Sequence, residues 1–180
     1  MQKAIKYDYK FLRKVRLSDD IVITLDVDKA PITTANFLQY VKAGFYDGTI
    51  FHRVILGFVI QGGGFLPDLV KKQTGVGEAI ENEADNGLKN TKYTIAMALK
   101  GDDPQSATSE FFFNLNDNNS LNLNSNTNTT NFGYTVFGEV TEESQKVLDK
   151  IADTTTETTN DKQNVPVMDI IIDQAEIVNE

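Results

Sequence analysis

The chain of 180 residues has no cysteine and only one histidine, His52. The lack of cysteine excludes disulfides and thiolate metal sites, although it does not distinguish a reducing from an oxidising compartment. A serine–histidine–aspartate triad would depend on His52, and no G-x-S-x-G motif accompanies it. With so few nitrogen and sulfur ligands, we expect no metal site.

Long apolar runs are also missing. No stretch of about 18 apolar residues exists, so we expect no membrane-spanning helix. The first residues carry positive charge but no apolar core of a signal peptide. We therefore expect a cytoplasmic protein, with the periplasm as the alternative if a leader was removed before residue 1. The net charge of −9 argues against nucleic acid or an anionic membrane as the main partner.

The chain length is typical of one domain, and we interpret residues 1–180 as a single domain. Positive charge is concentrated at its start, where six Lys or Arg among residues 1–16 stand against one acid. Apolar residues alternate with these charges at period 2. We therefore interpret residues 1–14 as an N-terminal extension or an edge strand with a solvated face, and a contact with a partner is the alternative.

Strand-like patterns dominate the sequence. They mark β-rich runs at residues 21–25, 51–61, 94–99, 110–115, 134–140 and 167–178. Two segments predict helices: residues 31–43, which begin at Pro31 and end before Gly44, and residues 142–152, which have acids in the first turn. Many strands with two separated helices indicate a mainly β domain, either a barrel or a sandwich, capped by helices.

Two polar stretches are predicted as long loops. Residues 114–131 are rich in Asn, and residues 153–164 are polar without a period, so we expect both to be too polar to pack. The acids between Glu78 and Asp85 lack the spacing of a calcium loop, and a solvated loop is the simpler interpretation.

An arginine within an apolar run is the most unusual local feature. Counting alternate positions along residues 51–61, Arg53 and Gln61 project to one side, unless a bulge at Gly57 changes the phase. Arg53 is then either a packed arginine whose charged end reaches water or part of a groove for peptides. The run of Phe111, Phe112 and Phe113 also alternates, so one ring can belong to the core and another to a pocket wall.

The run from Phe51 to Phe65, FHRVILGFVIQGGGF, closely resembles the signature of cyclophilins. Further motifs similar to that family surround it in order: Gly44-Phe45-Tyr46-Asp47-Gly48-Thr49, Asn82-Glu83-Ala84-Asp85-Asn86-Gly87-Leu88, Thr94-Ile95-Ala96-Met97-Ala98, Ser106-Ala107-Thr108-Ser109-Glu110-Phe111-Phe112, Phe132-Gly133-Tyr134 and Val136-Phe137-Gly138. The resemblance covers about residues 15–178, and the forms of several motifs are similar to bacterial members.

The resemblance implies a closed antiparallel β-barrel of eight strands capped by two α-helices. It implies peptidyl-prolyl cis-trans isomerase activity that assists protein folding, without a cofactor. Matched by position, Arg53 is the catalytic arginine, with Phe58 and Gln61 beside it. Proline-containing peptides and unfolded protein clients would bind against the remaining matched positions, which are Val59, Ala98, Phe112, Leu121 and Tyr134. We expect a monomer.

The chain departs from the family pattern at several places near this site. Ser120 stands where a tryptophan is common, so we expect weak or no cyclosporin binding. Glu110 stands where a glutamine is usual, which places an anion near the groove and could alter peptide preference. Residues 122–131 form an Asn-rich loop insertion beside the pocket. These departures motivate a second hypothesis, a non-catalytic proline-peptide binding or chaperone module.

A third hypothesis uses the basic start of the chain as the contact of an interaction domain. For His52, alternation from Arg53 predicts that the ring points to the opposite face of the strand. We therefore interpret His52 as a structural residue and not as a base. Rotation about an X-Pro bond breaks no covalent bond, so the reaction needs neither a nucleophile nor a metal.

Overall fold

The computed structural model describes residues 3–11, 20–123 and 132–178. Its strands and helices, in chain order, are β1 (Lys3–Phe11), β2 (Asp20–Leu25), α1 (Pro31–Lys42), β3 (Phe51–Ile55), β4 (Val59–Gly62), β5 (Phe65–Leu66), η1 (Pro67–Leu69), β6 (Val70–Lys71), β7 (Thr94–Met97), β8 (Phe111–Asn114), η2 (Asn119–Leu121), β9 (Val136–Val140), α2 (Glu142–Ala152), β10 (Thr156–Thr159), β11 (Lys162–Pro166) and β12 (Ile170–Val178). The expectation of a mainly β protein with two α-helices is confirmed.

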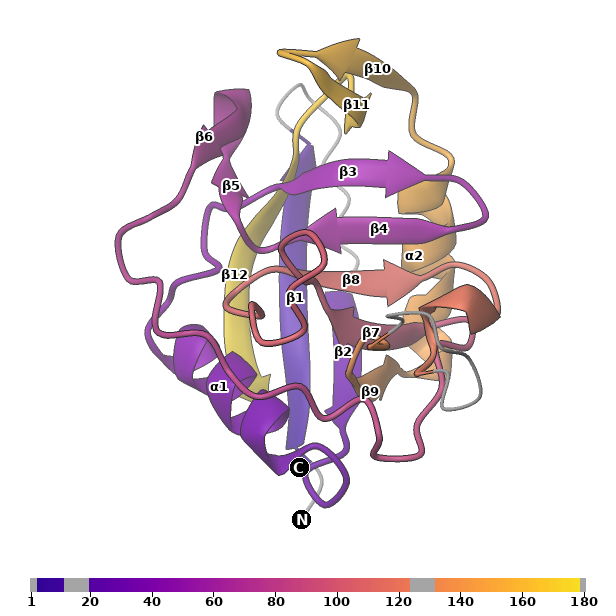
Figure 1. Ribbon diagram of the computed structural model, residues 1–180. Coiled ribbons are helices and arrows are strands. Elements are labelled where there is room, and N and C mark those ends of the chain that lie inside the picture. Colours follow the sequence, from indigo (N-terminus) through magenta and orange to yellow (C-terminus); the bar gives the residue numbers. More distant parts are fainter. Residues whose placement is uncertain (1–2, 12–19, 124–131, 179–180) are drawn as a thin grey trace.

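One 8-stranded antiparallel sheet dominates the molecule, in the order β12-β1-β2-β9-β7-β8-β4-β3 (Figure 1). The short pairs β5–β6 and β10–β11 form separate two-stranded ladders. The hydrogen-bonded order of the main sheet has two ends, β12 and β3, so the described ladder does not run continuously around a barrel. A single bridge between Ile50 and Ile171 joins the chain beside these two ends.

The basic start of the chain has a different place from the one we expected. Strand β1 pairs with β12 on one side and with β2 on the other, so it is an internal strand and not an edge strand. Residues 12–16 of the basic segment lie outside the described residues. Period 2 identifies a strand, but it carries no information about how many neighbours that strand has.

Both predicted helices are present. In Figure 1, α1 lies beside β12, and α2 lies behind the ends of β3, β4 and β8. The start of α1 is capped from far along the chain: Glu83 accepts hydrogen bonds from the backbone N–H groups of Ile32 and Thr33 and from the Thr33 hydroxyl, at 3.1, 2.8 and 2.7 Å. Glu83 therefore satisfies N–H groups that have no partner inside the helix, and it is not a solvated acid.

The main core lies between the sheet and the two helices. At its centre the ring of Phe37, from α1, packs against Tyr46, Phe111 and Phe137 with centroid distances of 5.2, 5.4 and 5.1 Å. Tyr46 is fully buried, and its hydroxyl donates to the carbonyl of Ser109 at 2.9 Å. Aromatic burial of this kind is a large contribution to the stability of the domain.

A second, smaller apolar cluster lies on the other face of the same strands. It consists of Val59, Ala96, Phe112 and Val136, one residue from each of β4, β7, β8 and β9. Their sequence neighbours Ile60, Ile95, Met97, Phe111, Phe113 and Phe137 belong to the main core. These four strands are thus covered on both faces, which explains why their sequences read as nearly continuous apolar runs.

Two predicted segments are hairpins in the structure. Residues 51–61 are not one run but β3 and β4, which are joined by a turn with Gly57 at φ 72°. The polar stretch 153–164, expected as a loop, contains β10 and most of β11. Asn160 and Asp161, with φ of 50° and 60°, make the turn between them, because Asn and Asp tolerate the left-handed region that tight hairpins require.

No helix in the described part of the chain is long and apolar enough to cross a bilayer.

Candidate active site

Val59 and Phe112 of the second apolar cluster line a cavity of about 180 Å³. Every residue that the sequence nominated for the site lines this cavity: Arg53, Phe58, Val59, Gln61, Ala98, Phe112, Leu121 and Tyr134. Leu99 also lines it and was not nominated. The structure thus brings together side chains from β3, β4, β8, the end of β7, η2 and the segment before β9.

The aromatic run of β8 divides between core and cavity as alternation predicts. Phe111 and Phe113 are fully buried in the main core, whereas Phe112 belongs to the second cluster and lines the cavity. The ring of Phe112 meets that of Tyr134 edge to face, with centroids 5.6 Å apart. These two rings give the cavity a rigid apolar wall of a size that suits a small ring.

Arg53 lies at the polar rim of the cavity. It is paired across the hairpin with Gln61, and its Nη1 donates to Gln61 Oε1 at 3.4 Å. The two residues are therefore neighbours on adjacent strands, and not positions on one strand as the alternation count assumed. The guanidinium has further N–H donors that this bond does not use.

Glu110 determines which way the Gln61 amide points. Gln61 Nε2 donates to Glu110 Oε2 at 3.1 Å. An ionised carboxylate can only accept hydrogen bonds, so the amide nitrogen of Gln61 must face Glu110 and its oxygen must face Arg53. Glu110 also forms an ion pair with Lys71 from β6. The charged contacts thus run from Lys71 through Glu110 and Gln61 to Arg53.

His52 lies on the same side as Arg53, contrary to the prediction from alternation. The pairing of β3 with β4 shifts register between Phe51 and Arg53, and this irregularity turns the His52 ring toward Glu110. Its Nε2 lies 3.5 Å from Glu110 Oε2, and its ring packs on Phe65 with centroids 4.5 Å apart. Nδ1 is buried and has no hydrogen-bond partner in the described part of the chain.

The imidazole of His52 is neutral at physiological pH. Burial is the main cause that lowers its pKa from 6.5 to about 4, and the nearby cations Lys71, Lys162 and Arg53 act in the same direction. The carboxylate of Glu110 opposes this shift without overcoming it. A base with so low a pKa is a poor acceptor for catalysis at neutral pH, in keeping with the structural role expected for His52.

A network of buried asparagine amides supports the opposite wall of the cavity. Asn114 is fully buried, and its Nδ2 donates to Asn90 Oδ1 and Thr94 Oγ1 at 3.1 and 2.9 Å. Asn118 Nδ2 donates to Asn114 Oδ1 at 2.7 Å and to the carbonyl of Phe58 at 2.9 Å. The expectation that residues from 114 onward are too polar to pack is wrong here, because these amides satisfy one another.

The same network reaches two further walls of the cavity. Asn90 Nδ2 donates to the carbonyls of Leu121 and Tyr134, at 3.1 and 3.2 Å. The carbonyls of Phe58, Leu121 and Tyr134 are therefore all held by connected amides. This role of the asparagines was not predicted from the sequence, although Asn next to apolar positions is a signal that a polar group is buried. Most of the expected insertion, residues 124–131, lies outside the described residues.

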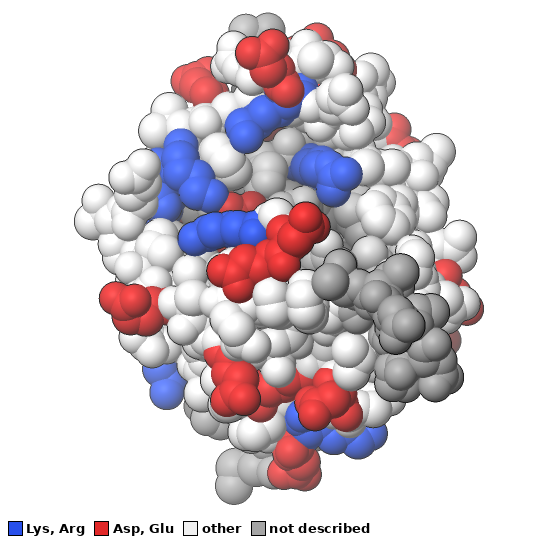
Figure 2. Space-filling view, viewed as in Figure 1, with Lys and Arg blue, Asp and Glu red and all other residues white. Residues whose placement is uncertain are grey.

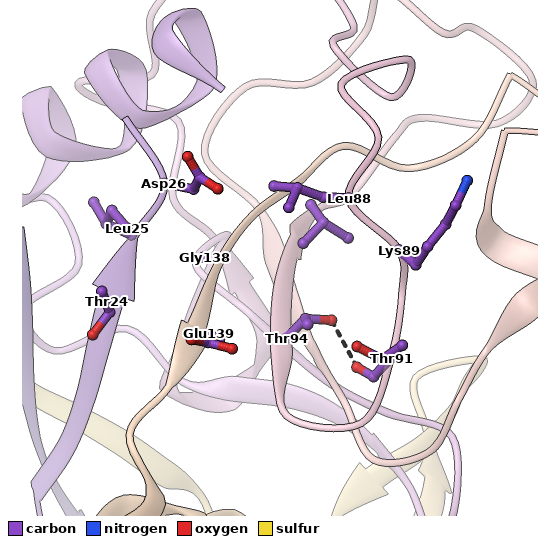
Figure 3. Close-up of a pocket in the computed structure, with 10 residues that line it drawn as sticks. Thr24, Leu25, Asp26, Leu88, Lys89, Thr91, Thr94, Gly138 and Glu139 are labelled. Carbon is purple, nitrogen blue, oxygen red and sulfur yellow. Dashed lines mark hydrogen bonds between the residues drawn. The ribbon is translucent and has the colours of Figure 1, made fainter. Parts of the chain in front are cut away.

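A separate cavity of about 230 Å³ lies between β2, β9 and the loop before β7 (Figure 3). Its lining includes Asp26, Lys89 and Glu139, and it contains none of the nominated site residues. In Figure 3, Thr94 bonds to Thr91 at its edge, with its hydroxyl donating to the carbonyl at 2.7 Å. The nearby Asp26 carboxylate accepts from the N–H of Lys29. The nominated residues all line the cavity beside Arg53, which is therefore the candidate active site.

Within the described residues, no group of three or more His, Cys, Asp or Glu is arranged to hold a metal ion.

Comparison with known proteins identifies the family. Residues 12–177 match the family model described as cyclophilin type peptidyl-prolyl cis-trans isomerase/CLD. A peptidyl-prolyl cis-trans isomerase of Streptomyces antibioticus is 51% identical over 158 residues, which cover 88% of this chain and 92% of the relative. Peptidyl-prolyl cis-trans isomerase B of Escherichia coli K12 is 49% identical over 158 residues, which cover 88% of this chain and 93% of the relative.

Solved cyclophilin structures have the same fold as this chain. A cyclophilin type peptidyl-prolyl cis-trans isomerase of Cryptosporidium parvum superposes with a TM-score of 0.75 at 25% identity, covering 100% of this chain and 99% of that one. The chain therefore belongs to the cyclophilin-type peptidyl-prolyl cis-trans isomerases, the enzymes that interconvert the cis and trans forms of X-Pro peptide bonds.

Proposed function

We propose that this isomerase turns over proline-containing peptides, among them unfolded protein clients, in the cavity between Arg53 and Phe112. The observation that carries the proposal is the placement of a charged donor at the rim of an apolar pocket of about 180 Å³. Phe58, Phe112, Leu121 and Tyr134 hold the proline ring, with Val59 at the floor. Arg53 faces the prolyl amide from the other side.

Arg53 lowers the barrier by differential binding. The planar X-Pro bond is held by resonance, with a barrier of about 18–20 kcal/mol. As the bond twists, resonance is lost and electron density returns to the prolyl nitrogen. A guanidinium that binds this twisted state more strongly than the planar one accelerates the rotation. A charged donor in a site with little water can supply several kcal/mol of such stabilisation.

Gln61 and Ala98 hold the peptide chain in this proposal. Gln61 presents its amide beside Arg53, in the orientation that Glu110 imposes. The N–H of Ala98 already donates to the carbonyl of Glu110 at 2.9 Å, so we assign the contact with the peptide to the Ala98 carbonyl. Anchoring the chain on one side of the proline lets the carbonyl of the preceding residue swing while the ring stays fixed.

We further propose that the main sheet closes into a barrel through β3 and β12. The bridge between Ile50 and Ile171 supports this closure. Two backbone bonds add to it, from the Gly48 N–H to the Ile172 carbonyl and from the Ile172 N–H to the Thr49 carbonyl, both at 2.8 Å. Slow hydrogen exchange at the Ile172 amide, comparable with amides of β8, would support closure, and fast exchange would refute it.

We also propose that cyclosporin binds weakly or not at all. Ser120, where family members commonly have tryptophan, precedes Leu121 at the cavity wall and offers neither an indole ring nor its N–H donor. Titration of the protein with cyclosporin, monitored by inhibition of isomerisation, tests this statement. Inhibition at nanomolar concentrations would contradict it.

The decisive experiment measures isomerisation of a short Ala-X-Pro-Phe reporter peptide by wild type and by Arg53→Ala. We expect Arg53→Ala to lose about 100- to 1000-fold in kcat/KM while it stays folded and still binds the peptide. A folded Arg53→Ala protein with full activity would show that another group is catalytic. If wild type binds the peptide without accelerating exchange, the cavity is a binding module only.

A further inference from the structure

A second hollow adjoins the proposed proline pocket. It has a volume of about 440 Å³ and lies between β3, β6 and the β10–β11 hairpin. Arg53 and Gln61 line both cavities, so the two are separated only by this pair. On the face drawn in Figure 2, Lys and Arg side chains gather around a hollow in the upper half, where β3, β6 and β11 lie in Figure 1.

The charges of this hollow do not balance. Three cations line it, Arg53, Lys71 and Lys162, against the single carboxylate of Glu110. His52, also in the lining, is neutral at pH 7 because its pKa is about 4. The hollow therefore carries two net positive charges in a chain whose net charge is −9. A local excess of this kind attracts anionic groups and disfavours cationic ones.

Glu110 does not cancel this excess, because its oxygens are already engaged. Oε1 pairs with Lys71, and Oε2 accepts from Gln61 and lies near His52. Glu110 and Lys71 thus neutralise each other. The unpaired cations are Arg53, whose hydrogen-bond partner Gln61 is neutral, and Lys162, which has no carboxylate within ion-pairing distance among the described residues.

Lys162 lines the hollow and is held in place by the ring of Phe65. Its Nζ lies over the ring of Phe65, 4.7 Å from the centroid, and the ring also carries Lys71 at 4.6 Å. Contact with the ring orients the ammonium group without removing its charge. The amide side chains of Gln163 and Asn164 line the same hollow and offer neutral donors beside it.

We propose that this hollow is a second substrate subsite that selects an acidic side chain close to the isomerised proline. The inference rests on the proposed function, because it assumes that the proline lies in the pocket across Arg53 and Gln61. An extended chain advances about 3.3–3.6 Å per residue, so a side chain within three residues of the proline reaches the hollow. An Asp or Glu there pairs with Lys162, whereas a Lys there is repelled.

The experiment measures kcat/KM for a family of peptides in one Ala-Pro frame. A single Glu is placed in turn at each of the three positions before the X-Pro unit and the three positions after it, with Gln and Lys at the same positions as neutral and opposite partners. We expect at least one position where Glu is preferred over Gln about fivefold, through a lower KM, and where Lys is disfavoured. The preference falls when salt rises from 20 to 500 mM.

Lys162→Gln tests the assignment to this hollow. It should abolish the Glu preference while leaving kcat on the neutral peptides unchanged. Lys89→Gln is the matched control, since Lys89 is an exposed lysine that lines the separate cavity of Figure 3. The control should keep the preference in full. Equal rates for Glu and Gln at every position, or a preference that survives Lys162→Gln, would overturn the subsite.

Failure of the subsite is distinguishable from failure of the proposed function. If the proline lies elsewhere, Phe112→Ala and Arg53→Ala will leave turnover of the neutral peptides unchanged. If only the subsite is wrong, both variants will lower kcat/KM on the neutral peptides, and wild type will show equal kcat/KM for Glu and Gln at every position.

Discussion

The two sides of the cavity between Arg53 and Phe112 are held by different chemistry. On one side, the buried amides of Asn90, Asn114 and Asn118 fix backbone carbonyls of the apolar wall. On the other, Arg53 is positioned through Gln61 by a carboxylate that also holds a lysine. The neutral network lies deep in the fold, whereas Lys71 in the charged one has 41% of its side chain exposed.

This contrast separates residues that stabilise the fold from residues that adjust activity. A buried neutral network is costly to leave half satisfied, and it responds to neither salt nor moderate pH. A partly exposed charged network contributes little to stability, but it orients the Gln61 amide and, through it, positions Arg53. We therefore expect changes on the amide side to act mainly on folding, and changes on the charged side to act mainly on activity and pH dependence.

The largest effect on folding is expected for Asn114→Ala. The substitution removes two donated bonds and one accepted bond, and it leaves Asn90 and Asn118 with unpaired buried groups. We expect a loss of about 3–4 kcal/mol in the free energy of unfolding, measured by urea titration. Asn116→Ala is the control, because Asn116 is an exposed neighbour in the same loop and should change stability by less than about 0.5 kcal/mol. Equal losses in the two variants would show that the buried amide network does not contribute special stability to its side of the cavity.

The next effect is a pH dependence of stability on the charged side. The folded pKa of His52 is about 4, below its usual 6.5, so between these values the unfolded chain binds a proton that the folded chain does not. The free energy of unfolding should therefore fall as the pH drops from about 6.5 to about 4, by up to about 3 kcal/mol.

Because His52 is the only histidine, the interval from pH 7 to pH 5 isolates most of this effect from carboxylate titration. Urea titrations at several pH values in this interval measure it, with His52→Gln as the comparison. The slope should be present in wild type and absent from His52→Gln. The same slope in both proteins would mean that the histidine is not buried in its neutral form.

The smallest effect is expected for Glu110→Ala. Without the carboxylate, the Gln61 amide loses the partner that fixes its orientation, so Arg53 is held less well. We expect kcat/KM on a neutral peptide to fall about three- to tenfold, while the free energy of unfolding changes by less than about 1 kcal/mol. Lys71→Ala removes the other partner of Glu110 but keeps the bond to Gln61, so it should lower kcat/KM less. A larger loss in Lys71→Ala would show that Lys71, and not the hydrogen bond between Glu110 and Gln61, is the contact that supports activity.

Much of the fold could be read from the sequence because local patterns determine it. Pro31 and Gly44 marked the bounds of α1 to within one residue, and acids in the first turn marked the start of α2. The signature from Phe51 to Phe65 identified the family, and with it the residues that line the cavity. Alternation in the β8 run separated the two core rings from Phe112, because a strand places successive side chains on opposite faces.

Only the tertiary structure decided which polar residues are buried and what they contact. Asn114 and Glu83 are ordinary members of polar segments, until distant strands and α1 bring them the partners that satisfy them. His52 faces Glu110 because of an irregularity in the β3–β4 ladder that no period reveals. Hydrogen bonds and charge pairs depend on distances between segments remote in the chain. Local patterns in the sequence indicated most of the strands, both helices and Arg53 as the candidate catalytic residue, whereas packing determined the environment of Arg53.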